Sequence, residues 1–314
     1  MHLTLFITIL IVITNMKRIS FFSYLHPWSF QLHQNCLDSL PTNSKSLPEL
    51  RALVCGADFA QLDSSSIYIA TGLIHLFVVS GAHLILIQKI LNLCTSFNKP
   101  KKWPRLLCLI GLIYFSACCD FNPPVTRALI SLILVDDFVI KKQFWPVHFR
   151  ILIIGLMTLL FNFNWITSLS LQLSWLIALG LLLNREFLPD GHPLVRQSLN
   201  YILIFPTLLF LQVPQPIIIL IHVIFSTFLE VILFPFALIV RFIHRLSPSF
   251  DFLIWILRSV LTKIETPLEF QLVDKPLGLV IFNWGFLFFI HLTLHLYFIQ
   301  KERRITCAYF GSTG

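Results

Sequence analysis

A succession of apolar runs, separated from one another by short polar loops, makes up most of this chain and limits the folds open to it. A helix needs about 20 mostly apolar residues to cross a bilayer, and fewer where flanking side chains reach the headgroups. The runs cover residues 67–97, 105–119, 124–140, 147–163, 166–183, 199–213, 217–240, 250–262 and 277–299, of which 250–262 is short enough for a half-helix or an interfacial helix. Only 12% of the residues are charged, against about 25% in soluble domains. We therefore predict an all-α polytopic integral membrane protein, with about 9–10 transmembrane or partly spanning helices plus an outer amphipathic helix.

Basic residues gather in alternate loops between these runs. The fourteen that do so are Lys99, Lys101, Lys102, Arg105, Lys141, Lys142, Arg150, Arg185, Arg196, Arg241, Arg245, Lys301, Arg303 and Arg304. The intervening loops at 161–167 and 212–216 carry none. Because cytoplasmic loops are enriched in Lys and Arg, this alternation places the C-terminus in the cytoplasm and residues 19–66 outside. Lys17 and Arg18 would then lie outside, against the rule, so either the first run is not a true span or the fourteen other basic residues outweigh these two. The net charge of +8 reflects the same bias and does not by itself indicate nucleic acid.

These boundaries divide the chain into four parts. We predict an N-terminal membrane span at 1–15, a short extracytoplasmic segment at 16–66, a transmembrane domain at 67–300 and a basic cytoplasmic tail at 301–314. Apolar residues at helical spacing around 47–60 predict an amphipathic helix on the outer surface. The seven cysteines show neither metal-ligand spacing nor the pattern of a disulfide framework, and no cofactor fingerprint occurs. We therefore expect no cofactor and no metal.

Small and polar residues interrupt the apolar run at 67–97. They are Thr71, Gly72, His75, Ser80, Gly81 and His83. Thr71, Gly72 and His75 fall within about one helical turn, while His75 and His83 share one broad face. The Ser80-Gly81 pair is typical of a helix kink. Two interpretations stay open: a small-residue packing face between helices, or a polar lumen, which two histidines in one span favour.

Three later runs carry isolated polar groups. Arg127 falls about one turn inside its run, where an arginine costs free energy unless it reaches the headgroups or faces water. It either pairs with Asp120 or lies at the mouth of a pore, where a guanidinium would attract phosphate. Gln172 and Ser174 are suited to hydrogen bonds between helices. Glu230, deep in the run at 217–240, would pair with an arginine or carry a proton.

Three strings occur in order: TGLIHLFVVSGAH at 71–83, PPVTRA at 123–128 and LQLSWLIALG at 171–180. Together they resemble the membrane domain of the ComEC/Rec-type competence protein family, whose members carry TG-x-x-HLL-x-x-SG-x-H, then S-x-x-RA, then GFQLSF-x-A-x-LGL. The resemblance extends from about residue 47 to residue 300, and its first string is the most specific. The sequence departs from the pattern at Trp175, where the family has Phe, and in the residues that lead into Arg127.

The resemblance implies that residues 67–300 form a competence-type transmembrane channel domain in the cytoplasmic (inner) membrane. Its expected function is inward transport of single-stranded DNA during natural transformation, without enzymatic activity and without catalytic residues. The residues that the resemblance places along the DNA path are Thr71, Gly72, His75, Ser80, Gly81, His83, Arg127, Gln172 and Ser174. Glu230 is a candidate charge partner on the strength of its position alone, and it suits a DNA pore only if its charge is neutralised. A polyanion that crosses a low-dielectric slab needs a wet polar path and some positive charge, which agrees with this set.

The expected partners are single-stranded DNA, the lipid bilayer, a separate DNA receptor and a separate cytoplasmic motor protein. Full-length family members also carry an OB-like and a metallo-β-lactamase-like domain, which we do not recognise in this sequence, so a separate nuclease and an oligomeric state stay open. The alternatives are a small-solute transporter or an inactive scaffold derived from the family. An intramembrane hydrolase or acyltransferase that uses Ser80 and His83 is less favoured, because no acid is evident to orient the histidine.

Overall fold

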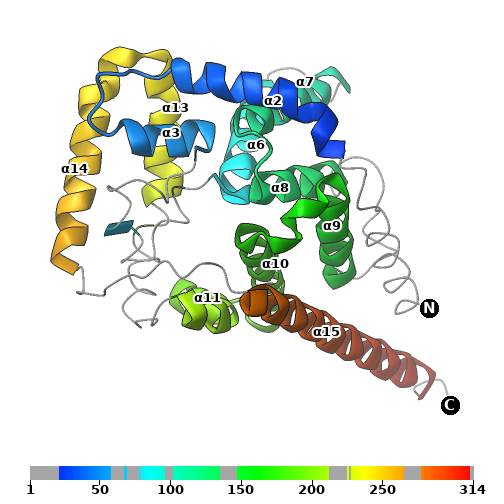
Figure 1. Cartoon of the computed structure of the whole chain (residues 1–314). Helices are drawn as coiled ribbons and strands as arrows, with labels where there is room; N and C mark the ends of the chain where they lie inside the picture. The colour runs from blue at the N-terminus through cyan, green and yellow to red at the C-terminus, as the bar shows by residue number, and fades with distance from the viewer. Residues whose placement is uncertain are drawn as a thin grey trace.

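The computed structural model describes residues 21–57, 67–68, 77, 79–95, 102–134, 147–211, 225, 228–264 and 277–311, and every regular element in these ranges is helical (Figure 1). The predicted all-α class is therefore confirmed for the described part of the chain. The α-helices are α2 (Phe21–Asp38), α3 (Leu47–Cys55), α6 (Gly81–Thr95), α7 (Lys102–Cys118), α8 (Pro123–Ile133), α9 (Val147–Phe161), α10 (Leu169–Phe187), α11 (Pro193–Leu211), α13 (Phe234–Phe242), α14 (Ser247–Ile264) and α15 (Leu277–Gly311). The N-terminal span predicted at 1–15 lies outside the described residues.

Helices α7 to α15 coincide with the predicted apolar runs, and most begin within a few residues of the expected positions. The run at 67–97 differs, because α6 begins only at Gly81, after non-helical Val79 and Ser80. Residues 301–311, predicted as a tail, continue α15. In the described ranges one helix, Gly278–Lys301, is long and apolar enough to cross a membrane alone. Shorter apolar helices cover Gly81–Leu93, Leu106–Cys118, Pro123–Ile133 and Val147–Phe161.

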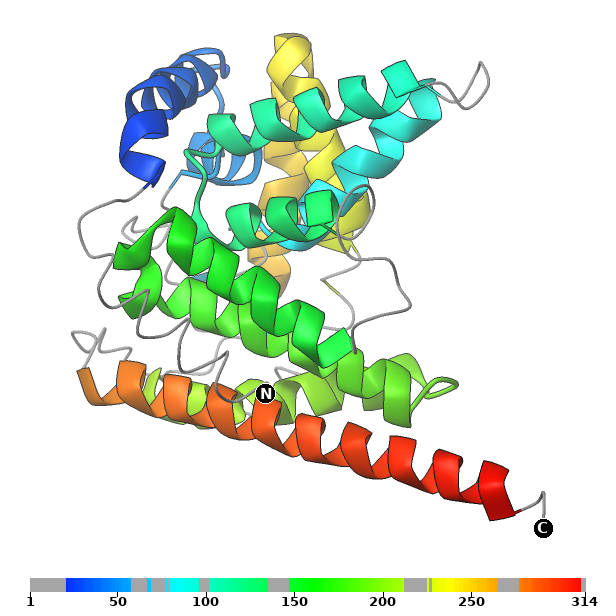
Figure 2. The same cartoon turned by 90° about the vertical axis from the view of Figure 1, so that its right-hand side faces the viewer.

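The buried apolar residues form two clusters. The first is built mainly from α2, α3, α6, α7, α8, α13 and α14 and includes Leu50, Phe77 and Phe234, each fully buried. The second is built from α9, α10, α11 and α15 around Trp175 and Leu176. Helix α8 packs against α6, α7, α9 and α10, so it connects the two clusters (Figure 1). In the view rotated by 90°, α15 runs along the lower edge of the molecule beside α11 (Figure 2).

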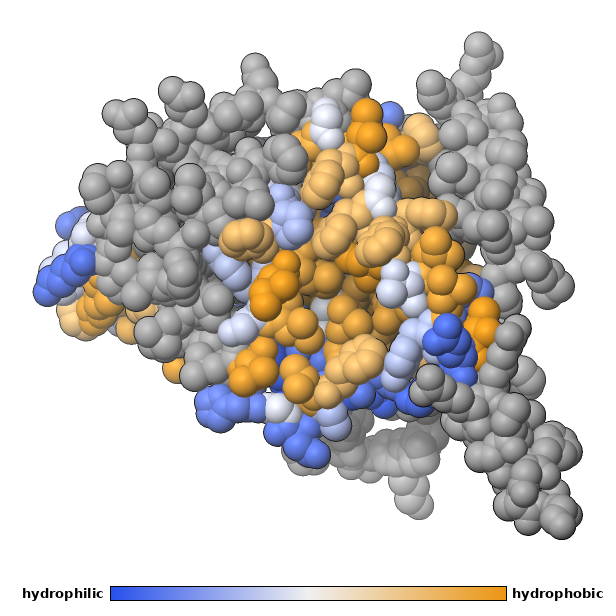
Figure 3. All heavy atoms as spheres, turned by 90° about the horizontal axis from the view of Figure 1, so that it is seen from below, coloured by the Kyte–Doolittle hydropathy of each residue, from blue (hydrophilic) through white to orange (hydrophobic). Residues whose placement is uncertain are grey.

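The outside of the molecule is rich in large apolar side chains. On α11 and α15, Ile202, Ile281 and Phe289 are 64%, 62% and 63% exposed. Seen from below, the described residues present a broad apolar face with hydrophilic residues along one edge (Figure 3). Such a surface is unusual for a soluble monomer, in which contiguous exposed apolar patches rarely exceed a few hundred Å².

The segment from α2 to α3 differs from the sequence-based expectation in two respects. A disulfide joins Cys36 to Cys55, although the cysteine spacing indicated no disulfide framework. The spacing could not reveal it, because the two residues meet only when α2 and α3 pack against each other. The predicted helix at 47–60 exists as α3, which ends at Cys55; it packs against α2 and α13 and buries Glu49 completely.

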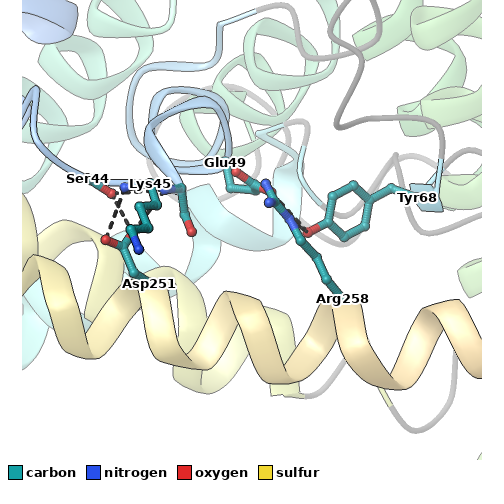
Figure 4. Close-up of polar contacts among 7 residues, drawn as sticks. Ser44, Lys45, Glu49, Tyr68, Asp251 and Arg258 are labelled. Carbon is teal, nitrogen blue, oxygen red and sulfur yellow. Dashed lines mark hydrogen bonds and ion pairs between the residues drawn. The ribbon is translucent and has the colours of Figure 1, made fainter.

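Two groups of polar contacts join α14 to α3 and to the residues just before it, and both lie on one side of α14 (Figure 4). At the start of α14, Asp251 accepts hydrogen bonds from the Ser44 hydroxyl (2.7 Å) and from the backbone N–H groups of Lys45 (3.0 Å) and Ser46 (2.9 Å). Burial raises the pKa of Asp251, but these hydrogen bonds outweigh it and lower the pKa below its usual value. Two turns along α14, Arg258 donates to Glu49.

The Glu49–Arg258 pair lies in an asymmetric environment. The Glu49 side chain is fully buried, whereas that of Arg258 is 34% exposed. Tyr68 also donates its hydroxyl hydrogen to Glu49 Oε1 over 3.1 Å. Because α14 carries Asp251, Arg258 and Lys263, we do not treat it as a membrane-spanning helix.

A tight turn at 119–122 sets the start of α8. Asp120 and Phe121 have φ angles of 47° and 45°, and the Asn122 side chain accepts a hydrogen bond from the Val125 N–H as the N-cap of α8. Gly56, at φ 68°, ends α3 against this turn, and a Cβ on it would lie 3.0 Å from the Cβ of Cys119. The turn thereby fixes the start of α8 and, with it, the position of Arg127.

Candidate functional site

The first motif contributes the start of α6. The Ser80 N–H donates to His83 Nδ1 over 2.9 Å, and the Ser80 hydroxyl accepts from the Ala82 N–H over 3.2 Å. This reciprocal arrangement resembles a capping box, with histidine in place of the usual Glu or Gln. It explains why the helix begins at Gly81 and does not continue through the predicted kink. Thr71, Gly72 and His75 lie outside the described residues.

His83 is almost completely buried, at 1% exposure, and its ring contacts that of Phe234 with centroids 4.3 Å apart. Because Nδ1 accepts from Ser80, the proton of the neutral ring is on Nε2. That nitrogen has no hydrogen-bond partner within the described residues. His83 is therefore an interior group with one unused donor.

The second and third motifs meet directly. Arg127 Nε on α8 donates a hydrogen bond to Ser174 Oγ on α10 over 2.9 Å. Asp120, the alternative partner, instead accepts from the Ser29 hydroxyl over 2.6 Å, and His26 lies 3.8 Å from it. Among the described residues no carboxylate forms an ion pair with Arg127, and the bond to Ser174 uses one of the five N–H donors of its guanidinium.

The first motif also contacts α8, at Ala128, the residue after Arg127. A Cβ added to Gly81 would lie 3.1 Å from the Cβ of Ala128, so the missing side chain lets the start of α6 approach α8 closely. Gly81, Arg127 with Ala128, and Ser174 come from three separate apolar runs. Helix α8 is thus the point at which the three motifs converge, with α6 and α10 as its neighbours (Figure 1).

Gln172 faces away from this point and lies in a buried polar network. Its Oε1 accepts from Asn283 Nδ2 over 2.9 Å, and Asn283 Oδ1 accepts from the Thr207 hydroxyl over 2.8 Å. The Gln172 amide also donates to the carbonyls of Ile166 and Val280, each over 3.4 Å. Gln172, Asn283 and Thr207 are each 0% exposed. The network joins α10, α15 and α11.

A second polar contact joins α10 to α15. Trp175 Nε1 donates to His291 Nε2 over 2.9 Å, and the indole fits against Gly155 of α9, where an added Cβ would lie 2.2 Å from the ring. A phenylalanine at position 175 could not donate this hydrogen bond. The Trp at position 175 and the His at position 291 therefore form a matched pair in this chain.

Glu230 lies in a π-helical segment, Leu229–Leu233, that precedes Pro235. It forms no ion pair with any residue in the described ranges. Of the two alternatives, the pairing with an arginine is thus not formed among the described residues. Segments of π-helix are frequent at functional sites, but here the following proline gives a sufficient reason for the irregular hydrogen bonding.

Sequence reasoning missed several polar residues that the fold buries, namely Glu49, Thr207, Asn283 and His291, and it also missed Arg258, the half-buried partner of Glu49. Asn283 and His291 lie within the apolar run at 277–299, and Thr207 within 199–213, so the rule that flagged Ser80 and Gln172 also applies to them. The described residues contain no group of His, Cys, Asp or Glu side chains arranged to hold a metal.

Comparison with known proteins gives one match. The family described as "Competence protein" matches residues 59–303, which is most of the chain. No curated protein and no solved structure matches it. The matched range includes all three motifs and the whole cluster around α8.

Proposed function

The chain belongs to the competence protein family, and on that premise we propose that it is the membrane core of a DNA-uptake system, a multi-pass channel in the cytoplasmic membrane that moves single-stranded DNA inward during natural transformation. The observation that carries the proposal is the arginine at the convergence of the three motifs, bound to Ser174 and without a carboxylate partner in the described residues. A guanidinium in this state is suited to bind a phosphate oxygen of a passing strand.

The proposed orientation agrees with the disulfide. Disulfides persist in oxidising compartments and are rare in the cytosol. Cys36 and Cys55 both lie in the segment that the distribution of basic loops places outside. The exposed apolar side chains of α11 and α15 are in this proposal the surface that faces lipid.

The Ser80–His83 contact supports a structural role and not a catalytic one. The Ser80 hydroxyl accepts from the Ala82 N–H and lies 3.2 Å from His83 Nδ1. A hydrolase would need a third group to orient the histidine, and no described residue bonds to His83 Nε2. The proposal therefore assigns no reaction to this chain, and the DNA receptor, the motor and any nuclease would be separate proteins.

The test is cytoplasmic uptake of end-labelled DNA in the native cell, scored separately from DNA bound at the surface. We expect a deletion to abolish internalised strand, and Arg127→Ala to lower it roughly tenfold or more, the factor that corresponds to a charge-assisted hydrogen bond. Arg127→Lys keeps the charge but loses the planar guanidinium, so its uptake should lie between that of the wild type and that of Arg127→Ala. Arg245→Ala, at an exposed arginine of the turn before α14, is the matched control and should leave uptake unchanged.

Membrane levels of each variant are measured by immunoblot, so that loss of uptake is not confused with loss of protein. Unchanged uptake in the deletion strain would refute the DNA channel and favour a small-solute transporter or a scaffold. Normal uptake with Arg127→Ala would leave the family role in place but remove this arginine from the DNA path.

A further inference from the structure

Helix α10 is bound on two opposite sides. Ser174 on one side accepts from Arg127 of α8, and Gln172 on the other accepts from Asn283 of α15. Two residues along a helix differ by about 200° in direction, which is why these neighbours face different partners. Any rotation of α10 that breaks the bond at Gln172 also turns Ser174 away from Arg127.

Asn283 is the central member of the polar network on this side. Its side-chain oxygen accepts from Thr207 of α11 and its amide donates to Gln172, so both ends of the side chain are used. It is fully buried, and hydrogen bonds, unlike apolar contacts, are directional. A buried Asn that contacts two other helices therefore specifies their rotation as well as their separation.

We propose that Asn283 is a positioning residue, which acts through Gln172 to hold α10 at the rotation at which Ser174 orients the Arg127 guanidinium. In this arrangement Asn283 of α15 holds the rotation of α10. The rotation of α10 sets the position of Ser174, and Ser174 orients Arg127 of α8, which would contact the transported strand. The inference rests on the proposed function where DNA uptake is the readout, and a second readout below does not depend on it.

The first experiment separates positioning from mere stability. In Asn283→Leu, Gln172 Oε1 loses its donor and the Thr207 hydroxyl loses its acceptor, so both thermal stability and uptake should fall. In the triple variant Asn283→Leu, Gln172→Met, Thr207→Val no polar side-chain group of the network is left without a partner. The Ile166 carbonyl loses the Gln172 amide but keeps Trp284 Nε1 as a donor, and the Val280 carbonyl loses only a long contact of 3.4 Å. Replacement of all polar partners by apolar groups of the same shape is often nearly neutral for stability. We expect the thermal stability of the triple variant to return close to that of the wild type while uptake stays roughly tenfold low. Return of uptake together with stability would overturn the proposal.

Thr293→Val is the matched control, because Thr293 is an exposed residue of the same helix whose hydroxyl donates only to the carbonyl of Phe289, one turn back. It should change neither quantity. Ser174→Ala provides a second comparison. If Asn283 acts through Ser174, the double variant Ser174→Ala, Asn283→Leu should take up DNA no worse than the lower single variant at equal protein level. Losses that multiply would contradict the proposal.

The second readout needs no DNA. Ser174→Cys is introduced into the otherwise wild-type chain and into the Asn283→Leu and triple backgrounds, and its thiol is reacted with a water-soluble reagent in membranes. The proposal expects the labelling rate to change severalfold in both backgrounds and to stay constant with Thr293→Val. Unchanged rates would overturn the positioning role even if the deletion shows the chain to be the DNA channel. Changed rates would support it even if the deletion leaves uptake normal.

Discussion

The pair formed by Glu49 and Arg258 predicts an unequal response to removal of either partner. The Glu49 side chain is fully buried, whereas that of Arg258 is 34% exposed. In Arg258→Met the carboxylate would stay buried, and the Tyr68 hydroxyl would be its remaining side-chain donor among the residues that the structure describes. In Glu49→Leu the remaining guanidinium can turn toward solvent or headgroups, as long basic side chains do.

Breaking a buried pair so that one charge is left uncompensated costs about 3–5 kcal/mol, whereas exposed charges contribute about 0–1 kcal/mol. We expect Arg258→Met to approach the first range and Glu49→Leu to stay nearer the second, with a modest addition for the lost hydrogen bonds. At about 2–4 °C per kcal/mol for a chain of this order of size, Arg258→Met should lower the Tm by roughly 10 °C.

The assay is thermal unfolding of the protein in detergent micelles, with the double variant Glu49→Leu, Arg258→Met as the third member of the cycle. Replacement of a buried pair by apolar residues of similar volume is often neutral or stabilising, so the double variant should be more stable than Arg258→Met alone. Equal losses in the two single variants, or a double variant as unstable as Arg258→Met, would refute the reasoning.

Three further predictions concern the same unfolding assay. Gly155→Ala should lower stability by about 1–3 kcal/mol, because the new Cβ would lie 2.2 Å from the indole of Trp175, and Trp175→Phe should restore part of the loss; no such suppression would contradict the packing. Reduction of the Cys36–Cys55 disulfide, which closes a loop of 19 residues, should cost about 3 kcal/mol in the wild type and nothing in Cys36→Ala. Hydrogen bonding lowers the pKa of Asp251, so its stabilisation is complete above its unfolded pKa and is lost as the pH falls through the folded pKa; Asp251→Asn should flatten this acid dependence, and an unchanged profile would count against it.

The sequence located the helices well, and the reason is that a membrane-type helix is defined by its own length and apolarity. Runs such as 147–163 and 166–183 reappear as α9 and α10 with shifts of a few residues at their ends. The polar residues inside the apolar runs were equally easy to find, because their neighbours in the sequence are nearly all apolar. Arg127, Gln172 and Ser174 were singled out in this way, and each makes an interhelical hydrogen bond.

The partners of these residues could not be predicted, because they lie 47 and 111 positions away along the chain. Asp120 lies seven residues from Arg127 and has the opposite charge, so it was the natural local candidate. In the structure its carboxylate instead accepts a hydrogen bond from Ser29 of α2. The same limit hid the burial of Glu49, since its partner Arg258 is 209 residues distant. Charge type and local spacing are short-range information, whereas pairing between helices depends on how they pack.

The all-helical class, the apolar runs and the three motifs that mark the competence family can be read from the sequence alone, because each of these is carried by residues close together in the chain. Packing of the helices, in contrast, is needed to see that the motifs converge on α8, that Ser174 and not Asp120 binds Arg127, and that Asn283 joins α10, α11 and α15. A buried polar group must find a partner wherever the fold brings one within hydrogen-bonding distance, and the sequence does not encode that distance locally.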